Sequence, residues 1–138
     1  MYHVRYCGSH FEMGYKWGKR LRMHGIMILN NVPFEISEDR IEFARACLPY
    51  YETYFPEVLQ EIHGLAEGQE IPSDQLAGVL LSMYAIPPAT HCSVFAISDR
   101  ENILLARNSD FLTTLEDLNM NVLYTFKDCN THTAGDFS

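Results

Sequence analysis

The spacing of apolar positions predicts helices over the N-terminal two-thirds of the chain. Residues 2–6 are typical of a short strand, and a helix follows over residues 11–29. In that helix Gly14, Gly18 and Gly25 fall on one stripe, at spacings of four and seven. Each glycine inside a helix costs roughly 1 kcal/mol relative to alanine. The stripe therefore predicts that another backbone approaches closely, and the alternative is a poor helix that breaks near Gly25.

Three further helices are expected before the pair of adjacent prolines that precedes Cys92. Ser37 and Ser73 suit the N-caps of the first and third, and Pro56 suits the first turn of the second. Pro49 should kink or divide the first of these helices, and Gly68 should end the second. The apolar positions that recur at helical spacing are Ile41, Ala44, Leu48, Tyr51, Phe55, Val58, Leu59, Ile62, Leu65, Leu76, Val79, Leu80 and Met83.

After residue 91 the pattern changes from helix to sheet. Residues 92–98, 103–108 and 121–126 are runs of strand-forming residues, and the first two flank a polar loop at 99–102. This loop length predicts a hairpin in which position 92 lies opposite position 109. Helices followed by the start of an antiparallel sheet indicate an α+β fold.

Composition narrows the classes of protein that this chain could be. The 138 residues fit one core or a piece of one, and 47% apolar with 20% charged residues excludes a disordered or collagen-like chain. The net charge of −8 argues against nucleic-acid binding. Residues 1–34 carry five basic residues and one acid, against five and seventeen in residues 35–138. We interpret this asymmetry as two parts that attract each other.

The sequence gives no sign of a membrane span, a metal or a cofactor. Residues 75–98 lack charge, but two adjacent prolines split them, which suits a buried helix and a buried strand. The N-terminus MYHVRYCGSH has no apolar core of a signal peptide, so we expect a reducing, cytoplasmic location. The cysteines form no C-x-x-C pair, and no phosphate loop or nucleotide fingerprint is present.

Cys92 is the candidate nucleophile, because it begins a strand directly after a helix and a Pro-Pro break. A cysteine thiol becomes nucleophilic when a neighbouring group favours the thiolate. Arg107 is expected on the same face of the hairpin, as a diagonal neighbour that favours the thiolate. His91 does not complete a Cys–His pair, because adjacent residues of an extended segment point to opposite faces. The alternative is a buried structural cysteine.

Regular alternation puts Asn108 and Asp110 on the face opposite Cys92. Asp110 reaches Cys92 only if the strand ends or bulges near Ser109. The alternative for residues 107–110 is a polar strand end with a local salt bridge.

The run from Cys92 through fifteen residues to Asn108-Ser109-Asp110-Phe111 resembles the start of the mature chain in N-terminal-nucleophile hydrolases. It is most similar to the acyl-coenzyme A:6-aminopenicillanic acid acyltransferase family, to which the choloylglycine hydrolases are related. Residues 8–14 (GSHFEMG) with Gly18 resemble that family's G-x-x-x-E-x-G-x-x-x-G signature. Residues 61–68 (EIHGLAEG) resemble its E-x-x-G-[IL]-A-x-G segment.

The resemblance implies an αββα sandwich made as a precursor, of which this chain holds the N-terminal part. Residues 1–91 would be the helical prosegment, retained as a small subunit, and residues 92–138 the start of the nucleophile-bearing sandwich. The bond between His91 and Cys92 would break autocatalytically. Cys92 would then be the nucleophile and its new α-amino group the general base, with Asp110 orienting the amine. Arg107, with Asn108 beside it, would bind substrate or hold the site.

The activity implied is hydrolysis of a non-peptide linear amide through a thioester. The alternatives are an acyltransferase that moves an acyl group from a thioester to an amine, and a non-catalytic piece that keeps the family fold. His91 departs from the glycine that the acyltransferase has before its nucleophile. The chain also stops before the asparagines of the oxyanion hole, whose loss costs on the order of 100-fold in rate. The expected partners are therefore a small amide or acyl substrate and either a missing C-terminal half or a second copy, with no nucleic acid, membrane or cofactor.

Overall fold

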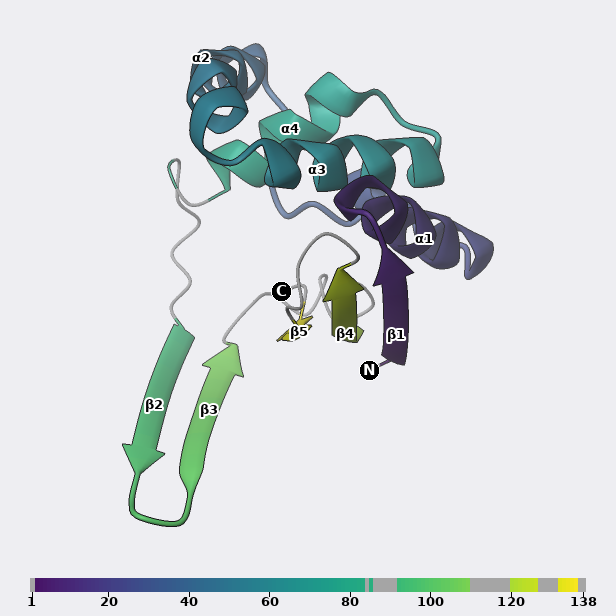
Figure 1. Cartoon of the computed structure of the whole chain (residues 1–138). Helices are drawn as coiled ribbons and strands as arrows, with labels where there is room; N and C mark the ends of the chain where they lie inside the picture. Colours follow the sequence, from purple (N-terminus) through teal and green to yellow (C-terminus); the bar gives the residue numbers. More distant parts are fainter. Residues whose placement is uncertain (1, 84, 86–91, 110–119, 127–131, 137–138) are drawn as a thin grey trace.

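The computed structural model describes residues 2–83, 85, 92–109, 120–126 and 132–136. It has a layer of helices, a sheet beneath the first helix, and a separate hairpin (Figure 1). The helices are α1 (His10–Met23), α2 (Glu38–Tyr54), α3 (Pro56–Gln69) and α4 (Ser73–Ser82), with a 3-10 turn η1 (Ile28–Asn30). The strands are β1 (Tyr2–Gly8), β2 (Cys92–Ser98), β3 (Ile103–Ser109), β4 (Met120–Phe126) and β5 (His132–Asp136). This mixture confirms the α+β class.

The sheet beneath α1 joins the two ends of the chain in the order β1-β4-β5. β1 and β4 run parallel, with Tyr2 opposite Met120 and Gly8 opposite Phe126, while β5 is antiparallel to β4. The expected antiparallel hairpin is present as β2 and β3, and the parallel pair of β1 and β4 was not expected. Parallel strands need a long crossover connection, and here that connection contains all four α-helices and the hairpin. The local spacing of apolar and polar residues does not indicate which distant segments pair with each other.

Glycines bring the backbones of α1 and α3 into direct contact. A Cβ atom on Gly14 would overlap the carbonyl oxygen of Glu61, and one on Gly64 would overlap that of Phe11. Gly18 and Gly68 make the same kind of approach one turn further along, so the two helices run in the same direction. The predicted close approach of another backbone is thus confirmed at the first two glycines of the stripe.

The third glycine of the predicted stripe has a different role. α1 ends at Met23, and Gly25 follows with a left-handed φ of 75°. No atom lies within 4 Å of where its Cβ would be. The helix was predicted to reach residue 29 but ends at Met23. The alternative prediction, a break near Gly25, is therefore the correct one. Only glycine adopts this φ without strain, so the same residue that was assigned to the stripe ends the helix.

A capping box begins α1. The Ser9 side chain accepts a hydrogen bond from the Glu12 amide at 3.3 Å, and the Glu12 carboxylate accepts one from the Ser9 amide at 2.8 Å. These two bonds satisfy amide groups that have no partner within the helix. The Glu12 of the G-x-x-x-E-x-G motif thus has a structural task at the helix start.

The buried side chain of Gln69 ties the segment after α1 to the end of α3. Its Oε1 accepts from the Ile28 amide at 2.8 Å, and its Nε2 donates to the carbonyls of Gly18 at 2.8 Å and Ile26 at 3.2 Å. Gln69 is the last residue of α3, and Glu70 follows as a left-handed cap. The prediction that the helix ends at Gly68 was wrong by one residue. Gly68 is needed instead for the contact with α1.

The buried Arg40 joins α2 to α4. Its guanidinium donates to Ser82 Oγ at 2.8 Å and stacks 3.7 Å from the ring centroid of Phe34. α2 continues through Pro49 without the predicted division. α4 begins at Ser73 with Pro72 as its N-cap, one residue before the predicted cap.

The core lies among the helices and against β1. Its largest fully buried apolar side chains are Met13, Leu21, Ile28, Leu76 and Val79. Of the positions predicted from helical spacing, Leu59, Ile62 and Leu65 are buried. Phe55, between α2 and α3, and Val58, in the first turn of α3, are exposed. Among the described helices, none combines the length and the apolar character that crossing a bilayer requires.

The α1–α3 contact predicts a large penalty for one methyl group. We expect Gly64→Ala to lower the free energy of unfolding by at least about 2 kcal/mol, because the new Cβ meets backbone atoms that cannot rotate away. The control is Gly78→Ala in α4, whose nearest neighbour is the flexible Ile41 side chain at 3.3 Å. We expect this control to stay within about 1 kcal/mol of the unmodified protein in urea titrations. Equal stability of the two variants would contradict the backbone contact.

Candidate functional site

A tight turn sets the geometry of the hairpin that carries Cys92. The Asp99 carboxylate accepts hydrogen bonds from the amides of Glu101 at 2.8 Å and Asn102 at 2.7 Å. The Asp99 amide donates to the Asn102 carbonyl at 2.9 Å. These backbone bonds lower the pKa of Asp99 below its ordinary value of 3.8, because they stabilise the charged form. The turn therefore fixes the loop at four residues and, with it, the pairing of the strands.

The register of β2 and β3 is the one that the sequence predicts. Cys92 is the first residue of β2 and lies opposite Ser109, and Arg107 lies opposite Val94. Positions 92, 94, 107 and 109 share one face of the hairpin by strand alternation. The diagonal relation of Cys92 and Arg107 across the two strands is confirmed for their backbone positions.

The other predicted site residues are not all brought to that face. Asn108 lies opposite Ser93, so its position is on the second face of the hairpin. The ladder is regular as far as the pair of Cys92 and Ser109. His91 and Asp110 lie outside the described residues. The bulge or strand end that would bring Asp110 to Cys92 stays a prediction.

Both faces of the hairpin carry exposed apolar side chains. Val94 and Leu105 on the face of Cys92 are 66% and 70% exposed, and Phe95 and Leu104 on the second face are 56% and 52% exposed. Figure 1 shows that β2 and β3 extend away from the helices. The expectation that residues 92–98 form a buried strand was therefore wrong for this chain. An apolar run indicates that a strand is more stable when buried. Burial also requires other elements that pack on its two faces, and the run itself gives no information on these.

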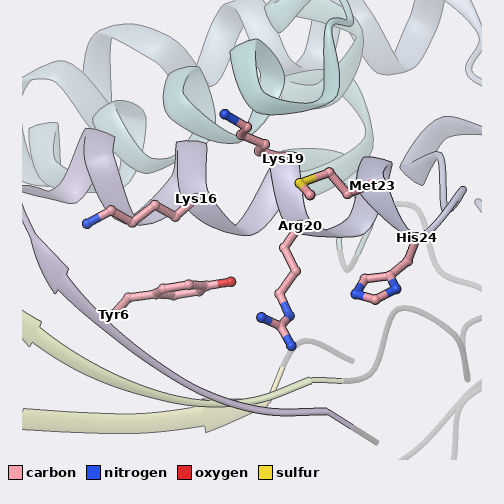
Figure 2. Close-up of a pocket in the computed structure, with 6 residues that line it drawn as sticks. All are labelled: Tyr6, Lys16, Lys19, Arg20, Met23 and His24. Carbon is pink, nitrogen blue, oxygen red and sulfur yellow. The ribbon is translucent and has the colours of Figure 1, made fainter.

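A second group of polar side chains, which the sequence analysis missed, lies between α1 and β1. Tyr6, Lys16, Lys19, Arg20, Met23 and His24 line a cavity of about 280 Å³ (Figure 2). The signal in the sequence was the excess of basic residues in positions 1–34. That excess was interpreted as an attraction between two parts of the chain, and three of those five basic residues, Lys16, Lys19 and Arg20, line the cavity instead.

Within the described residues, no group of three or more His, Cys, Asp or Glu side chains is arranged to hold a metal ion. The chemistry that the hairpin offers is that of a cysteine at a strand start, with an arginine position diagonal to it on the neighbouring strand.

No model of a known protein family matches this chain, and no curated protein does either. The family resemblance carried by the motifs therefore stays a prediction, and the activity that it implies is a proposal.

The turn predicts how the hairpin responds to acid. Because the folded pKa of Asp99 is depressed, its contribution is present above the ordinary value of 3.8 and is lost as the pH falls through the folded pKa. We expect Asp99→Ala to speed hydrogen exchange of the Glu101 and Asn102 amides at least about threefold at neutral pH.

Asp99→Asn is the matched control, because its amide oxygen still accepts the two hydrogen bonds and carries no charge. We expect it to keep the turn and to lose the acid response. If Asp99→Ala exchanged as slowly as the unmodified chain, the turn would not depend on this carboxylate.

Proposed function

We propose that this chain carries the nucleophile of a cysteine N-terminal-nucleophile amidohydrolase with an αββα sandwich fold. The observation that carries the proposal is the position of Cys92 at the first residue of β2, with Arg107 diagonal to it on β3. The proposed cleavage makes Cys92 a chain terminus, and the described strand β2 begins at this residue.

The proposed activation breaks the bond between His91 and Cys92. The Cys92 thiolate attacks the carbonyl carbon of His91, and the peptide nitrogen leaves as the new α-amine after taking up a proton. Water then hydrolyses the thioester, which restores the thiol and gives His91 a carboxylate. The products are residues 1–91 and residues 92–138, and one water molecule is consumed.

The same thiol then serves in the reaction with substrate. The new α-amine has an ordinary pKa near 8, close to that of a thiol, so its unprotonated form accepts the thiol proton. The thiolate attacks the carbonyl carbon of a linear amide, the amine product leaves with that proton, and water hydrolyses the thioester. Asp110 orients the α-amine, and Arg107 holds the substrate carbonyl or carboxylate, while Asn108, on the second face of the hairpin, has no contact with substrate in this scheme.

The helical part supports the proposed small subunit. The motif glycines Gly14, Gly18, Gly64 and Gly68 form the contact between α1 and α3, so the two upstream motifs are joined in space. β1 also pairs with β4, one strand on each side of the proposed cleavage. The two products would therefore stay associated through a shared sheet after the bond breaks.

The exposed apolar side chains of the β2–β3 hairpin support a fold in which this two-stranded sheet is covered on both faces. Apolar side chains on both sides of β2 and β3 fit the inner sheets of a sandwich, where helices cover one face and a second sheet the other. The missing layer would come from a C-terminal half or from a second copy.

The same exposure favours a second candidate, in which this chain keeps the fold as a non-catalytic piece. An acyl site open to water would hydrolyse its thioester without selectivity for substrate.

An acyltransferase uses the same thioester with an amine in place of water, so the proposed residues would serve both reactions.

Intact mass of the denatured protein tests the activation. We expect two species split between His91 and Cys92, whose summed mass exceeds the 15.9 kDa chain by one water. Cys92→Ala should abolish the cleavage and leave one species, because it removes the attacking sulfur.

Cys47→Ala is the matched control, since Cys47 is a half-buried residue of α2, outside the hairpin. It should be cleaved like the unmodified chain. A single uncleaved species in all three proteins would reject the activation and favour the non-catalytic alternative.

A further inference from the structure

The cavity between α1 and β1 is built around Arg20. Its side chain extends from α1 toward the sheet, and the hydroxyl end of Tyr6 faces it from one side with the His24 ring on the other (Figure 2). Burial raises the pKa of Tyr6, and the positive charge of Arg20 partly offsets this. The hydroxyl and the guanidinium line the same cavity and can face one bound group (Figure 2).

The charge of Arg20 is half-buried and has no acidic partner among the described residues. The ion pairs in that part of the chain join His10 to Glu61, Arg22 to Glu70 and Arg45 to Glu38. Arg20 takes part in none of them, and its Nε atom is buried without a hydrogen-bond partner in the described structure. A buried cation is costly unless an opposite charge compensates it.

The rim of the cavity adds positive charge. Lys16 Nζ donates to the Cys7 carbonyl at 2.7 Å, and Lys19 Nζ lies 5.7 Å from the ring centroid of Tyr15. Neither contact neutralises the lysine, and both residues line the cavity, with the Lys19 ammonium directed away from Arg20 (Figure 2). This local field is positive although the chain as a whole carries a net charge of −8.

We propose that this cavity binds the oxyanion group of a small molecule, a carboxylate or a phosphate, with Arg20 as its principal ligand. The planar guanidinium matches two oxygens of either group, and the Tyr6 hydroxyl and the His24 ring flank it. The volume of about 280 Å³ admits the anion with a compact organic body and not a macromolecule. This site is independent of Cys92 and of the proposed amidohydrolase.

The test is titration of the full chain with inorganic phosphate and, separately, with acetate at constant ionic strength, followed by backbone amide NMR. We expect saturable shifts at Tyr6, Arg20 and His24 with at least one of the two anions. Tighter binding of phosphate would indicate a phosphorylated ligand, and tighter binding of acetate a carboxylate. Shifts that grow linearly with either anion, without saturation, would overturn the proposal.

Arg20→Met should weaken this binding about tenfold or more, since it removes the charged donor. Arg22→Met is the matched control, because it removes the same charge two residues along α1 from a side chain paired with Glu70 outside the cavity. We expect it to change affinity less than about threefold. Equal weakening by both variants would show that net charge, and not a site, governs the binding.

A measurement on the unmodified protein covers the case in which Arg20→Met does not fold. Phenylglyoxal modifies accessible arginines, and mass spectrometry of peptides locates the product. We expect the saturating anion to slow modification of Arg20 at least about fivefold and to leave Arg22 unaffected. Equal rates at Arg20 with and without the anion would mean that Arg20 only complements the C-terminal end of α1.

Discussion

The direct contact of two backbones, α1 on α3, is the constraint on which the other features of the helical part depend. Glycines on both helices remove the side chains that would otherwise separate them. Once the helices lie this close, Gln69 reaches the carbonyl of Gly18 and holds the segment that follows α1. α1 also carries Arg20, whose side chain lines the cavity between this helix and β1.

Features that depend on neighbours in sequence could be predicted, and features that depend on distant segments could not. The hairpin register follows from a four-residue loop and the alternation of its strands, and the start of α3 follows from Pro56. The pairing of β1 with β4 has no local signal. Gly25 and Gly68 were misassigned because glycine serves helix ends and close packing equally well, and only the position of the partner helix distinguishes these uses. For the candidate site, backbone positions 92 and 107 were predictable, whereas the cavity at Arg20 required knowing which side chains of α1 face β1.

The motifs that resemble the acyltransferase family divide into two kinds. The two upstream motifs are accounted for by structure, because their glycines pack α1 on α3 and Glu12 completes a capping box. These two motifs are evidence about the fold and give no evidence about catalysis. The hairpin motif holds Cys92 and Arg107, so the proposed catalysis depends on these two residues. Any protein that needed the same helix packing could keep the first kind without the second.

The parallel pairing of β1 with β4 also constrains the order in which the chain acquires its structure. Residue 2 pairs with residue 120, so β1 is synthesised before the four helices and the hairpin, and its partner β4 only after them. The helices between them, whose contacts are mostly closer in sequence, can assemble while synthesis continues. During that interval the free edge of β1 can accept a strand from another molecule. The helices already contact β1 through the core around Val4, so they can hold this strand in place before β4 is available to pair with it.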